Sequence, residues 1–257
     1  MRLDQLLVDQ GLFPSRERAR RAVMAGRVLV DGQRVDKAGT RVGVAAALRL
    51  AGDEEPYASR AGRKLAHALA HFSVDVAGRV CLDVGASTGG FTDCLLQQGA
   101  QRVYAIDVGY GQLDLRLRKD PRVVVMERTN ARYLGADALG AAVSLVSIDV
   151  SFISLLKVVP ALLPHLLPGG WMITLIKPQF EVGRAQVGKG GVVRDPAVRR
   201  AVIDRRAAEI AALGPRLRGV VDAPIAGARA GNLEALAVFR QPASPGPSAP
   251  APGVGDG

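Results

Sequence analysis

Between residues 80 and 240, short apolar segments alternate with stretches whose apolar residues recur at the spacing of an amphipathic helix. The apolar segments predict seven strands, at residues 80–84, 102–106, 123–126, 144–148, 171–176, 217–223 and 233–240. Strands that alternate with helices form a mostly parallel sheet with helices on both faces. The pattern therefore predicts an α/β fold with a Rossmann-like, doubly wound, mostly parallel seven-stranded sheet, which binds ligands at the carboxyl ends of its strands.

Helical segments are expected between these strands. They cover residues 61–71, a stretch that follows the first strand and reaches Leu96, and residues 155–166 and 196–213. The last of these has the clearest boundaries in the sequence. Asp195 can cap its first turn, Pro196 fits its first position, and Gly214 follows its end.

The first predicted strand runs directly into a glycine-rich turn that opens a helix, in the sequence Asp83-Val84-Gly85-Ala86-Ser87-Thr88-Gly89-Gly90-Phe91-Thr92. Glycines allow the backbone to turn tightly and to approach a ligand closely. The spacing is Asp-x-Gly-x-x-x-Gly, and Ser87 stands where a dinucleotide-binding turn has its second glycine. A turn of this kind can also serve only to pack a helix on a strand. Whether it binds a cofactor, and which one, is therefore judged from the acidic residues around it.

Two carboxylates favour S-adenosylmethionine over NAD as the ligand of this turn. Asp83 would oppose a pyrophosphate but could accept a hydrogen bond from the amino group of a methionine moiety. Asp107 ends the second strand and could accept hydrogen bonds from both ribose hydroxyls of the cofactor. Asn130 follows the third strand, where an adenine would lie, although a polar loop is the ordinary explanation for it. The expected cofactor-binding residues are Asp83, Gly85, Ala86, Ser87, Thr88, Gly89, Gly90, Phe91, Thr92, Asp107, Asn130 and Asp149.

Four ionisable residues are candidates for catalysis. Asp149 and Lys177 end the fourth and fifth strands, so both would face the ligand-binding edge. Lys64 lies on the helix before the first strand, and Glu234 lies near the start of the last strand. A ribose hydroxyl is a poor nucleophile near neutral pH and needs a group that takes its proton or stabilises its alkoxide. Two lysines and two carboxylates suit this reaction without a metal, although alone Lys64 could be a solvated lysine and Asp149 a helix cap.

The first fifty residues form a basic segment with a different organisation. They hold ten Lys or Arg and five Asp or Glu, so their net charge is +5. This is half of the net charge of +10 of the whole chain. A first helix carries Leu3, Leu6 and Leu7, a second begins after Ser15, and Asp31-Gly32 favours a tight turn between two short strands. Clustered arginines suit a phosphate backbone, because each cation near a phosphate displaces condensed counterions.

This basic segment resembles the small S-four-type RNA-binding domain. The matching residues are Arg2-Leu3-Asp4, Ser15-Arg16-x-x-Ala19-x-x-x-Val23 and Gly26-x-Val28-x-Val30-Asp31-Gly32. The alternative is a basic helical hairpin that only covers the next domain. The expected domains are therefore a small α+β RNA-binding domain at residues 1–50, a linker at 51–58, a catalytic domain at 59–240, and a disordered tail rich in Pro, Gly and Ala at 241–257.

Net charge and cysteine content narrow the possible partners. A net charge of +10 and a pI near 10.3 favour a polyanionic partner, with nucleic acid ahead of an anionic membrane surface or a merely solvated basic surface. The two cysteines and three histidines show no metal-ligand spacing with a third ligand, so no metal is expected. The sequence has no signal-like segment or apolar run long enough to cross a membrane, which favours a cytoplasmic protein without stable membrane association.

From Tyr57 to Arg240 the chain resembles the hemolysin A-type (TlyA) family within the FtsJ-like ribose 2′-O-methyltransferases. Besides the glycine-rich turn, the motifs that carry the resemblance are Ser59-Arg60-x-x-x-Lys64-Leu65, Asp107-Val108-Gly109-Tyr110-Gly111-Gln112-Leu113, Asp149-Val150-Ser151-Phe152-Ile153-Ser154, Lys177-Pro178-Gln179-Phe180-Glu181 and Gly188-Lys189-Gly190-Gly191-Val192-Val193-Arg194-Asp195. The one small departure is Ala61-Gly62, where a glycine is expected first, and it leaves Lys64 in place.

The resemblance implies S-adenosylmethionine-dependent methylation of a cytidine 2′-hydroxyl in ribosomal RNA, with Lys64, Asp149, Lys177 and Glu234 as the catalytic set. Ribosomal RNA or ribosomal subunits are the expected partners. The residues expected to contact RNA are Arg2, Arg16, Arg18, Arg20, Arg21, Arg27, Arg60, Arg63, Arg184, Lys189 and Arg194. The last three lie in a glycine-rich loop, where they could also be merely solvated.

Three other functions compete with this hypothesis. An RNA-binding protein with an inactive methyltransferase fold is disfavoured by the intact set of four residues. A membrane-active hemolysin lacks a matching segment in the sequence. A methyltransferase acting on exocyclic amines usually needs an Asn/Asp-Pro-Pro-aromatic loop, whereas the fourth strand here ends in Asp149-Val150-Ser151-Phe152.

Overall fold

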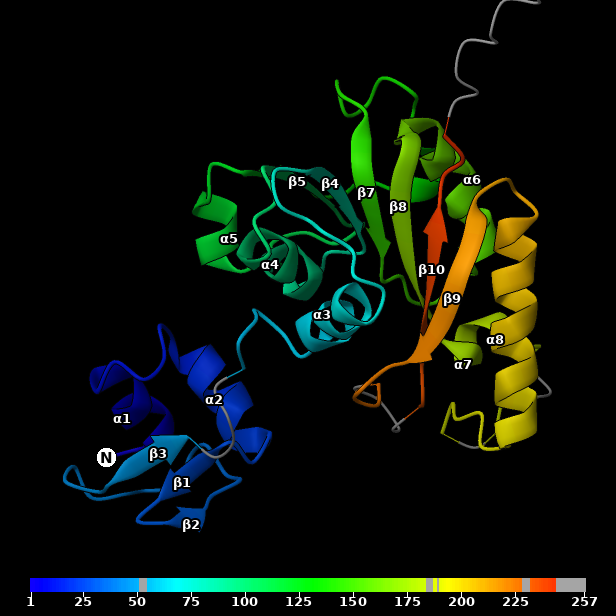
Figure 1. Cartoon of the computed structure of the whole chain (residues 1–257). Coiled ribbons are helices and arrows are strands. Elements are labelled where there is room, and N and C mark those ends of the chain that lie inside the picture. The colour runs from blue at the N-terminus through cyan, green and yellow to red at the C-terminus, as the bar shows by residue number, and fades with distance from the viewer. Residues whose placement is uncertain (51–54, 184–186, 189, 228–231, 244–257) are drawn as a thin grey trace, which may run out of the picture. The chain divides into compact units, whose positions relative to one another are not determined.

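The computed structural model describes residues 1–50, 55–183, 187–188, 190–227 and 232–243. The chain divides into two compact units, one up to Glu55 and one from Pro56 onward (Figure 1). No helix in the described part of the chain is long and apolar enough to cross a membrane. The two units are described separately below.

The N-terminal unit packs two helices against a small antiparallel sheet. Its elements are α1 (Leu3–Asp9), α2 (Arg16–Met24), β1 (Val28–Val30), β2 (Gln33–Arg34) and β3 (Leu48–Leu50), with the sheet order β2-β1-β3. The Ser15 hydroxyl accepts a hydrogen bond from the Arg18 amide and so caps α2 as expected. Asp31 and Gly32 both have positive φ, the conformation of a tight hairpin turn. Strand β3 was not anticipated from the sequence.

The second unit is built on the seven-stranded sheet that the sequence predicts. The strands are β4 (Val80–Val84), β5 (Arg102–Ile106), β6 (Val123–Met126), β7 (Val143–Ile148), β8 (Leu166–Ile176), β9 (Arg216–Asp222) and β10 (Ala235–Arg240). Their order is β6-β5-β4-β7-β8-β10-β9, and only β10 runs antiparallel to its neighbours. The carboxyl ends of β4, β5, β7 and β8 therefore meet at one edge of the sheet.

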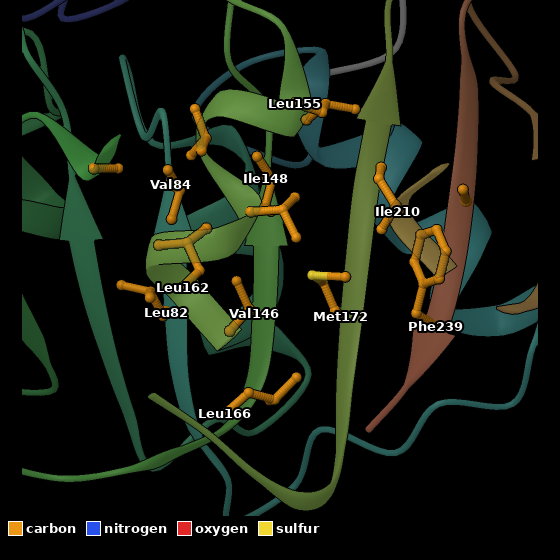
Figure 2. Close-up of a cluster of buried hydrophobic side chains, with 14 of the residues drawn as sticks. Leu82, Val84, Val146, Ile148, Leu155, Leu162, Leu166, Met172, Ile210 and Phe239 are labelled. Atoms are coloured by element: carbon orange, nitrogen blue, oxygen red, sulfur yellow. The ribbon is translucent and has the colours of Figure 1, made fainter. Parts of the chain in front are cut away.

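Helices cover both faces of this sheet. They are α3 (Ala61–His71), α4 (Gly90–Gln97), α5 (Leu115–Lys119), α6 (Val159–Leu162), α7 (Pro178–Glu181) and α8 (Pro196–Ala211), with 3₁₀ turns η1 (Ala131–Tyr133), η2 (Leu155–Lys157) and η3 (Leu163–His165). One face buries α6 and α8 against side chains such as Val146, Met172 and Phe239 (Figure 2). The other face buries α3 and α4 against Leu145 and Ile173. Successive strand residues thus point to opposite layers, which makes the fold doubly wound.

The structure differs from the predicted elements in several places. The helix expected at 155–166 is three short pieces, because Pro160 and Pro164 each remove a backbone donor. Strand β8 begins at Leu166, five residues before its predicted start. Residues 56–58 lie in the second unit rather than in a linker, and the Ala58 amide donates to Asp93 at 2.8 Å. Residues 51–54 of that linker and 244–257 of the expected tail lie outside the described residues.

Candidate active site

The glycine-rich turn after β4 passes directly under the end of β7. Gly85 has a φ of +84°, and a Cβ added there would lie 2.4 Å from the main-chain oxygen of Asp149. Only glycine therefore lets the turn approach β7 this closely. Ser87 takes a positive φ without being glycine, and its amide donates a 2.8 Å hydrogen bond to Asp107 at the end of β5. The turn is thus fixed to both neighbouring strands.

Asp83 lies beneath the turn and holds it from inside. Its side chain is fully buried, and its two carboxylate oxygens accept hydrogen bonds from Thr92 at 2.7 Å and Ser147 at 3.0 Å. Burial raises the pKa of this carboxyl to about 7, against the opposing effect of these two hydroxyls. The sequence suggested a contact between Asp83 and the amino group of the cofactor, but the structure places its carboxylate beneath the surface of the cavities described below.

The buried Asp83 predicts that the second unit loses stability as pH rises. The folded pKa of about 7 lies above the ordinary value of 3.8, so between these values the folded state holds a proton that the unfolded chain has released. The free energy of unfolding should therefore fall between about pH 4 and 7, by an amount on the order of 2–4 kcal/mol. Urea unfolding followed by the fluorescence of the single tryptophan, Trp171, at pH 5 and pH 8 measures this difference.

Asp83→Asn is the matched variant for that experiment, because an amide cannot ionise. We expect its stability to change less than that of the wild type between pH 5 and pH 8. An unchanged pH dependence in the variant would assign the effect to another group.

A cavity of about 700 Å³ opens between the ends of β5, β4 and β7. Asp107, Asn130 and Asp149 contribute polar groups to its lining, and Ile106 and Val108 contribute apolar ones. The Asp107 carboxylate also accepts a 2.7 Å hydrogen bond from the Gly109 amide, which fixes its orientation. Apolar walls with a few oriented polar groups are typical of a nucleoside-binding cavity.

A second cavity, of about 640 Å³, brings together the four residues proposed from the sequence as a catalytic set. They form two ion pairs. Lys177 Nζ lies 2.5 Å from Asp149 Oδ1, and Lys64 Nζ lies 2.5 Å from Glu234 Oε2. The second pair is the more buried, with side-chain exposures of 8% for Lys64 and 3% for Glu234. Lys177 also donates a 2.9 Å hydrogen bond to the Ser151 hydroxyl.

The two cavities meet at the end of β7. Ser87 and Asp149 line both of them, together with a smaller hollow of about 100 Å³ along the glycine-rich turn. A molecule seated over β4 and β5 can therefore present one end to the two lysines. This continuity is what a group-transfer reaction between two bound molecules requires.

A buried ion pair holds together the loops that carry Asp149 and Lys177. Glu181, at the end of α7, accepts a 2.8 Å hydrogen bond from the Leu155 amide, just after the loop that begins at Asp149. The same carboxylate lies 2.8 Å from Arg206 of α8, and both side chains of this pair are at most 8% exposed. Because α7 directly follows Lys177, the loops after β7 and β8 are anchored to one fixed point.

Comparison with known proteins places this geometry in a family. The model of the FtsJ-like methyltransferase family matches residues 57–234, and that of the S4 domain matches residues 1–47. The chain belongs to the FtsJ-like methyltransferase family. The resemblance described from the sequence is thereby confirmed, including the S4 domain at the N-terminus.

Relatives and solved structures extend this result. The chain is 50% identical to the 16S/23S rRNA (cytidine-2′-O)-methyltransferase TlyA of Mycobacterium tuberculosis, over 91% of this chain and 87% of that protein. It is 40% identical to Hemolysin A of Brachyspira hyodysenteriae, over 93% and 99% of the two chains. A solved structure described as a candidate hemolysin from Streptococcus thermophilus has 45% identity and a TM-score of 0.75, over 95% of this chain and 90% of that one.

The candidate site contains residues that the sequence did not point to. Ser151, Gln179 and Asn232 line the catalytic cavity, and Gln179 Nε2 lies 3.5 Å from Glu234 Oε1. Phe152 and Phe180 lie at the same cavity with their ring centroids 4.8 Å apart. Phe152 has a φ of +64° and is 79% exposed, which is unusual for a large apolar residue. All of these except Asn232 lie in the quoted motifs, but only the structure shows which residues of those motifs face the cavity.

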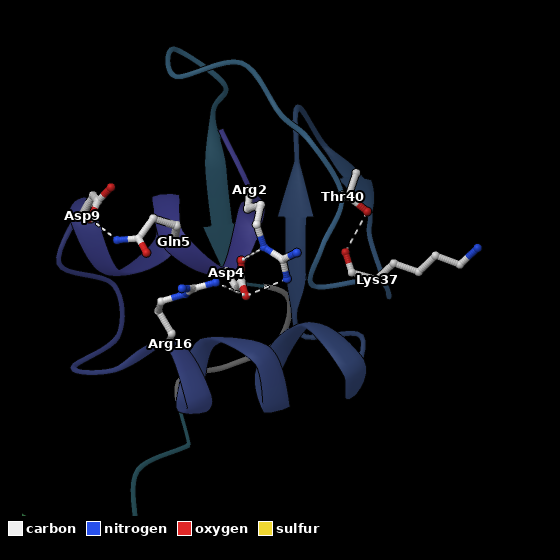
Figure 3. Close-up of polar contacts among 7 residues, drawn as sticks. All are labelled: Arg2, Asp4, Gln5, Asp9, Arg16, Lys37 and Thr40. Atoms are coloured by element: carbon white, nitrogen blue, oxygen red, sulfur yellow. Dashed lines mark hydrogen bonds and ion pairs between the residues drawn. The ribbon is translucent and has the colours of Figure 1, made fainter.

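The arginines expected to contact RNA have different environments in this methyltransferase. Arg2 and Arg16 both bond the buried Asp4 (Figure 3), and these contacts hold the pKa of its carboxyl at about 2. Both arginines are nevertheless exposed, as are Arg18, Arg20, Arg21, Arg27, Arg60 and Arg194. Among these, Arg21 pairs with Glu17, and Arg60 lines the catalytic cavity. Arg63 is half-buried, and Arg184 and Lys189 lie outside the described residues. RNA contact by these residues stays a prediction.

The structure also locates the cysteines and potential metal ligands. Cys81 and Cys94 are both buried and free, and burial raises the pKa of each thiol to about 12. Among the described residues, His, Cys, Asp and Glu form no group of three or more that could hold a metal ion.

Proposed function

We propose that this protein transfers a methyl group from S-adenosylmethionine to the 2′-hydroxyl of a cytidine in ribosomal RNA. The observation that carries the proposal is the Lys177–Asp149 pair, which lies where the two cavities join. The TlyA relative, at 50% identity over most of both chains, supports the same reaction and the same target.

The residues at the ends of β4 and β5 fit S-adenosylmethionine. The Asp107 carboxylate can accept hydrogen bonds from ribose hydroxyls, and Asn130 at the same cavity can contact an adenine. Position 85 must be glycine, because a side chain there would clash with the main-chain oxygen of Asp149 at the end of β7. When bound, the cofactor supplies an electrophilic methyl group on a sulfonium, which becomes a neutral thioether after transfer. Asp83 supports this site through Thr92 and the turn.

Lys177 is the residue best placed to act on the ribose hydroxyl. In the proposed reaction the Lys177 ammonium first releases one proton to solvent, and the neutral amine then receives the hydroxyl proton as the O–H bond breaks and the new O–C bond forms. Asp149 orients the amine and stabilises the ammonium that results, at 2.5 Å in the resting pair. The Ser151 hydroxyl, 2.9 Å from Nζ, limits the directions in which the lysine can point.

The buried Lys64–Glu234 pair lines the same cavity. We propose that Lys64 donates hydrogen bonds to the ribose and that Glu234 fixes the position of Lys64. Gly227 packs against Glu234 so closely that a Cβ there would lie 2.7 Å from Oε1. The pair is therefore held from two sides, which favours one orientation of the bound nucleotide.

The S4 domain and the overall charge support an RNA substrate. Residues 1–50 contribute half of the net charge, and their exposed arginines suit phosphate contacts. Intact ribosomal subunits are the proposed substrates, and the proposed location is therefore the cytoplasm.

Exposed Phe152 is proposed to stack on a base beside the target ribose. Substituting Phe152→Ala should change the free energy of unfolding by less than about 1 kcal/mol, because the side chain is 79% exposed. The KM for RNA should rise roughly tenfold, since stacking contributes about 1–3 kcal/mol per base. Steady-state methyl transfer at varied subunit concentration measures this effect. Phe152→Tyr keeps the ring and should stay close to wild type, and equal losses in both variants would contradict stacking.

The deciding experiment uses purified protein, radiolabelled S-adenosylmethionine and ribosomal subunits that lack the modification. Label should enter the RNA, and one nucleotide should become resistant to alkaline cleavage, because methylation removes the 2′-hydroxyl that alkali needs. Cofactor binding without any transfer to subunits or free RNA would instead support an RNA-binding protein with an inactive methyltransferase fold. Since one relative is named Hemolysin A, leakage from liposomes is measured in parallel, and we expect none.

A further inference from the structure

Six arginines lie near the amino ends of the parallel strands, at the opposite end of the sheet from the catalytic cavity. We call this region the basic edge. The six are Arg79, Arg102, Arg122, Arg216, Arg218 and Arg240. The strand register places them there. Arg102 pairs with Val80 at the amino ends of β5 and β4, and Arg240 pairs with Arg216 where antiparallel β10 ends beside the start of β9. This edge takes no part in the proposed site at the carboxyl ends of the strands.

The centre of the basic edge combines cations with an aromatic ring. The Arg240 guanidinium lies over the ring of Trp171 on β8, 4.3 Å from its centroid. Partial burial and the positive charges of Arg79 and Arg218 lower the pKa of Arg240, so three guanidinium groups share one region. Arginines interleaved with an aromatic side chain are typical of nucleic-acid-binding surfaces.

Few acidic side chains neutralise this region. Among the residues that the structure describes, Arg122 is the only one of the six arginines in an ion pair, with Asp120 at 2.8 Å. Arg79 donates instead to the main-chain oxygen of Asp75. A main-chain carbonyl group carries no net charge, so this contact does not neutralise the guanidinium. Like charges held close together raise the free energy of the surface, and a bound anion lowers it.

Protection of an exposed strand explains only part of this arrangement. Strand β9 is at the edge of the sheet, and charged residues on an edge strand discourage pairing with another chain. Arg216 and Arg218 could serve that purpose. Arg79 and Arg240 could not, because Arg79 directly precedes β4 and Arg240 ends β10, and both of these strands have neighbours on both sides.

We propose that the basic edge binds the phosphate backbone of a second segment of the RNA substrate, away from the nucleotide in the catalytic cavity. The inference rests on the proposed function for the identity of the RNA. Guanidinium groups bind phosphates through two parallel hydrogen bonds, and neighbouring strands repeat at about 4.8 Å, so a line of arginines along strand ends suits a repeating polyanion. Contacts of this kind position an RNA without reading its sequence.

The test compares two variants of the basic edge with a control of equal charge. Arg216→Gln/Arg218→Gln removes two exposed cations from β9, and Arg79→Gln removes one outside the edge strand. Arg199→Gln/Arg200→Gln on α8 loses the same charge as the double variant, from a helix that the inference does not involve. Filter binding to unmodified ribosomal subunits across a range of salt concentrations gives each affinity and its salt dependence.

We expect the double variant to bind about tenfold more weakly at physiological salt, and the slope of log K against log salt to fall by about 1–2. Arg79→Gln should lower the slope by about 1, and the control should stay within about twofold of wild type. Methyl transfer at saturating subunits should be unchanged, with KM raised in both edge variants.

Equal binding by the edge variants and the control would overturn the inference and leave these arginines as solvated or strand-protecting residues. Selective loss of binding to phosphatidylglycerol vesicles, with RNA binding intact, would overturn it in favour of a lipid surface. Binding and transfer are separate measurements. If the wild-type protein binds subunits through the basic edge but transfers no label, the proposed function is refuted and this inference is not.

Discussion

Substituting Lys177→Met is expected to lower the rate of methyl transfer by roughly 10²–10⁴-fold, the usual contribution of a positioned proton acceptor. Methionine has nearly the length of lysine but cannot receive a proton or offset the charge on the ribose oxygen. Lys177 is only 13% exposed and contacts both Asp149 and Ser151, so no other lysine can replace it without rearrangement. Single-turnover transfer with saturating cofactor and subunits isolates the chemical step.

Two controls make this result specific. Lys157→Met removes an exposed lysine from η2, and we expect wild-type rates for it. Isothermal titration of S-adenosylmethionine should give affinities within about threefold for Lys177→Met and wild type, because the lysine lines the catalytic cavity and not the one at Asp107. A Lys177→Met rate within tenfold of wild type would mean that the proton leaves by another path.

The buried Lys64–Glu234 pair should give the largest stability effect of any single substitution in the site. Lys64→Met leaves a carboxylate at 3% exposure without its cation, and Glu234→Gln leaves an ammonium at 8% exposure without its anion. Removing one partner of a buried pair costs about 3–5 kcal/mol, because the remaining charge is desolvated and uncompensated. Urea unfolding followed by Trp171 fluorescence, which reports on the second unit, measures each loss.

The double variant Lys64→Met/Glu234→Gln separates stability from catalysis. It should be less destabilised than the sum of the two single variants, since neither charge remains buried alone. Methyl transfer should stay low in all three variants, because Lys64 is either absent or no longer held in position by Glu234. The surface pair of Arg199 and Asp222 is the control, and Asp222→Asn at 65% exposure should change stability by less than about 1 kcal/mol. Additive losses in the double variant would show that the two side chains act independently.

Much of the fold could be predicted because its signals are local. Alternating apolar segments predicted all seven strands of the sheet, and Ser15 and Asp195 marked the starts of α2 and α8 as N-caps. Predictions failed where local patterns conflict, as in residues 155–166, where an apolar helical pattern contains two prolines that divide it. Strand β3, at Leu48–Leu50, was missed because three residues give too little periodicity to stand out.

The four proposed catalytic residues could be named from the sequence, but their pairing could not. Lys64 and Glu234 lie 170 positions apart and meet only because β10 inserts antiparallel between β8 and β9. The exposure of Phe152 also depends on the tertiary fold, since an apolar residue after a buried strand would ordinarily be expected to continue the core.

The sequence by itself determined the α/β class, the division into an S4 domain and a methyltransferase domain, and the residue types at the strand ends. These properties depend on periodicity, capping and spacing, which act over a few residues. Only the tertiary structure decided that Asp83 is buried beneath the turn and that the arginine before β4 and those of β9 and β10 share one edge. The reason is physical: burial, ion pairing and charge clustering depend on distances in space, and these follow from strand order and helix packing rather than from neighbours in the chain.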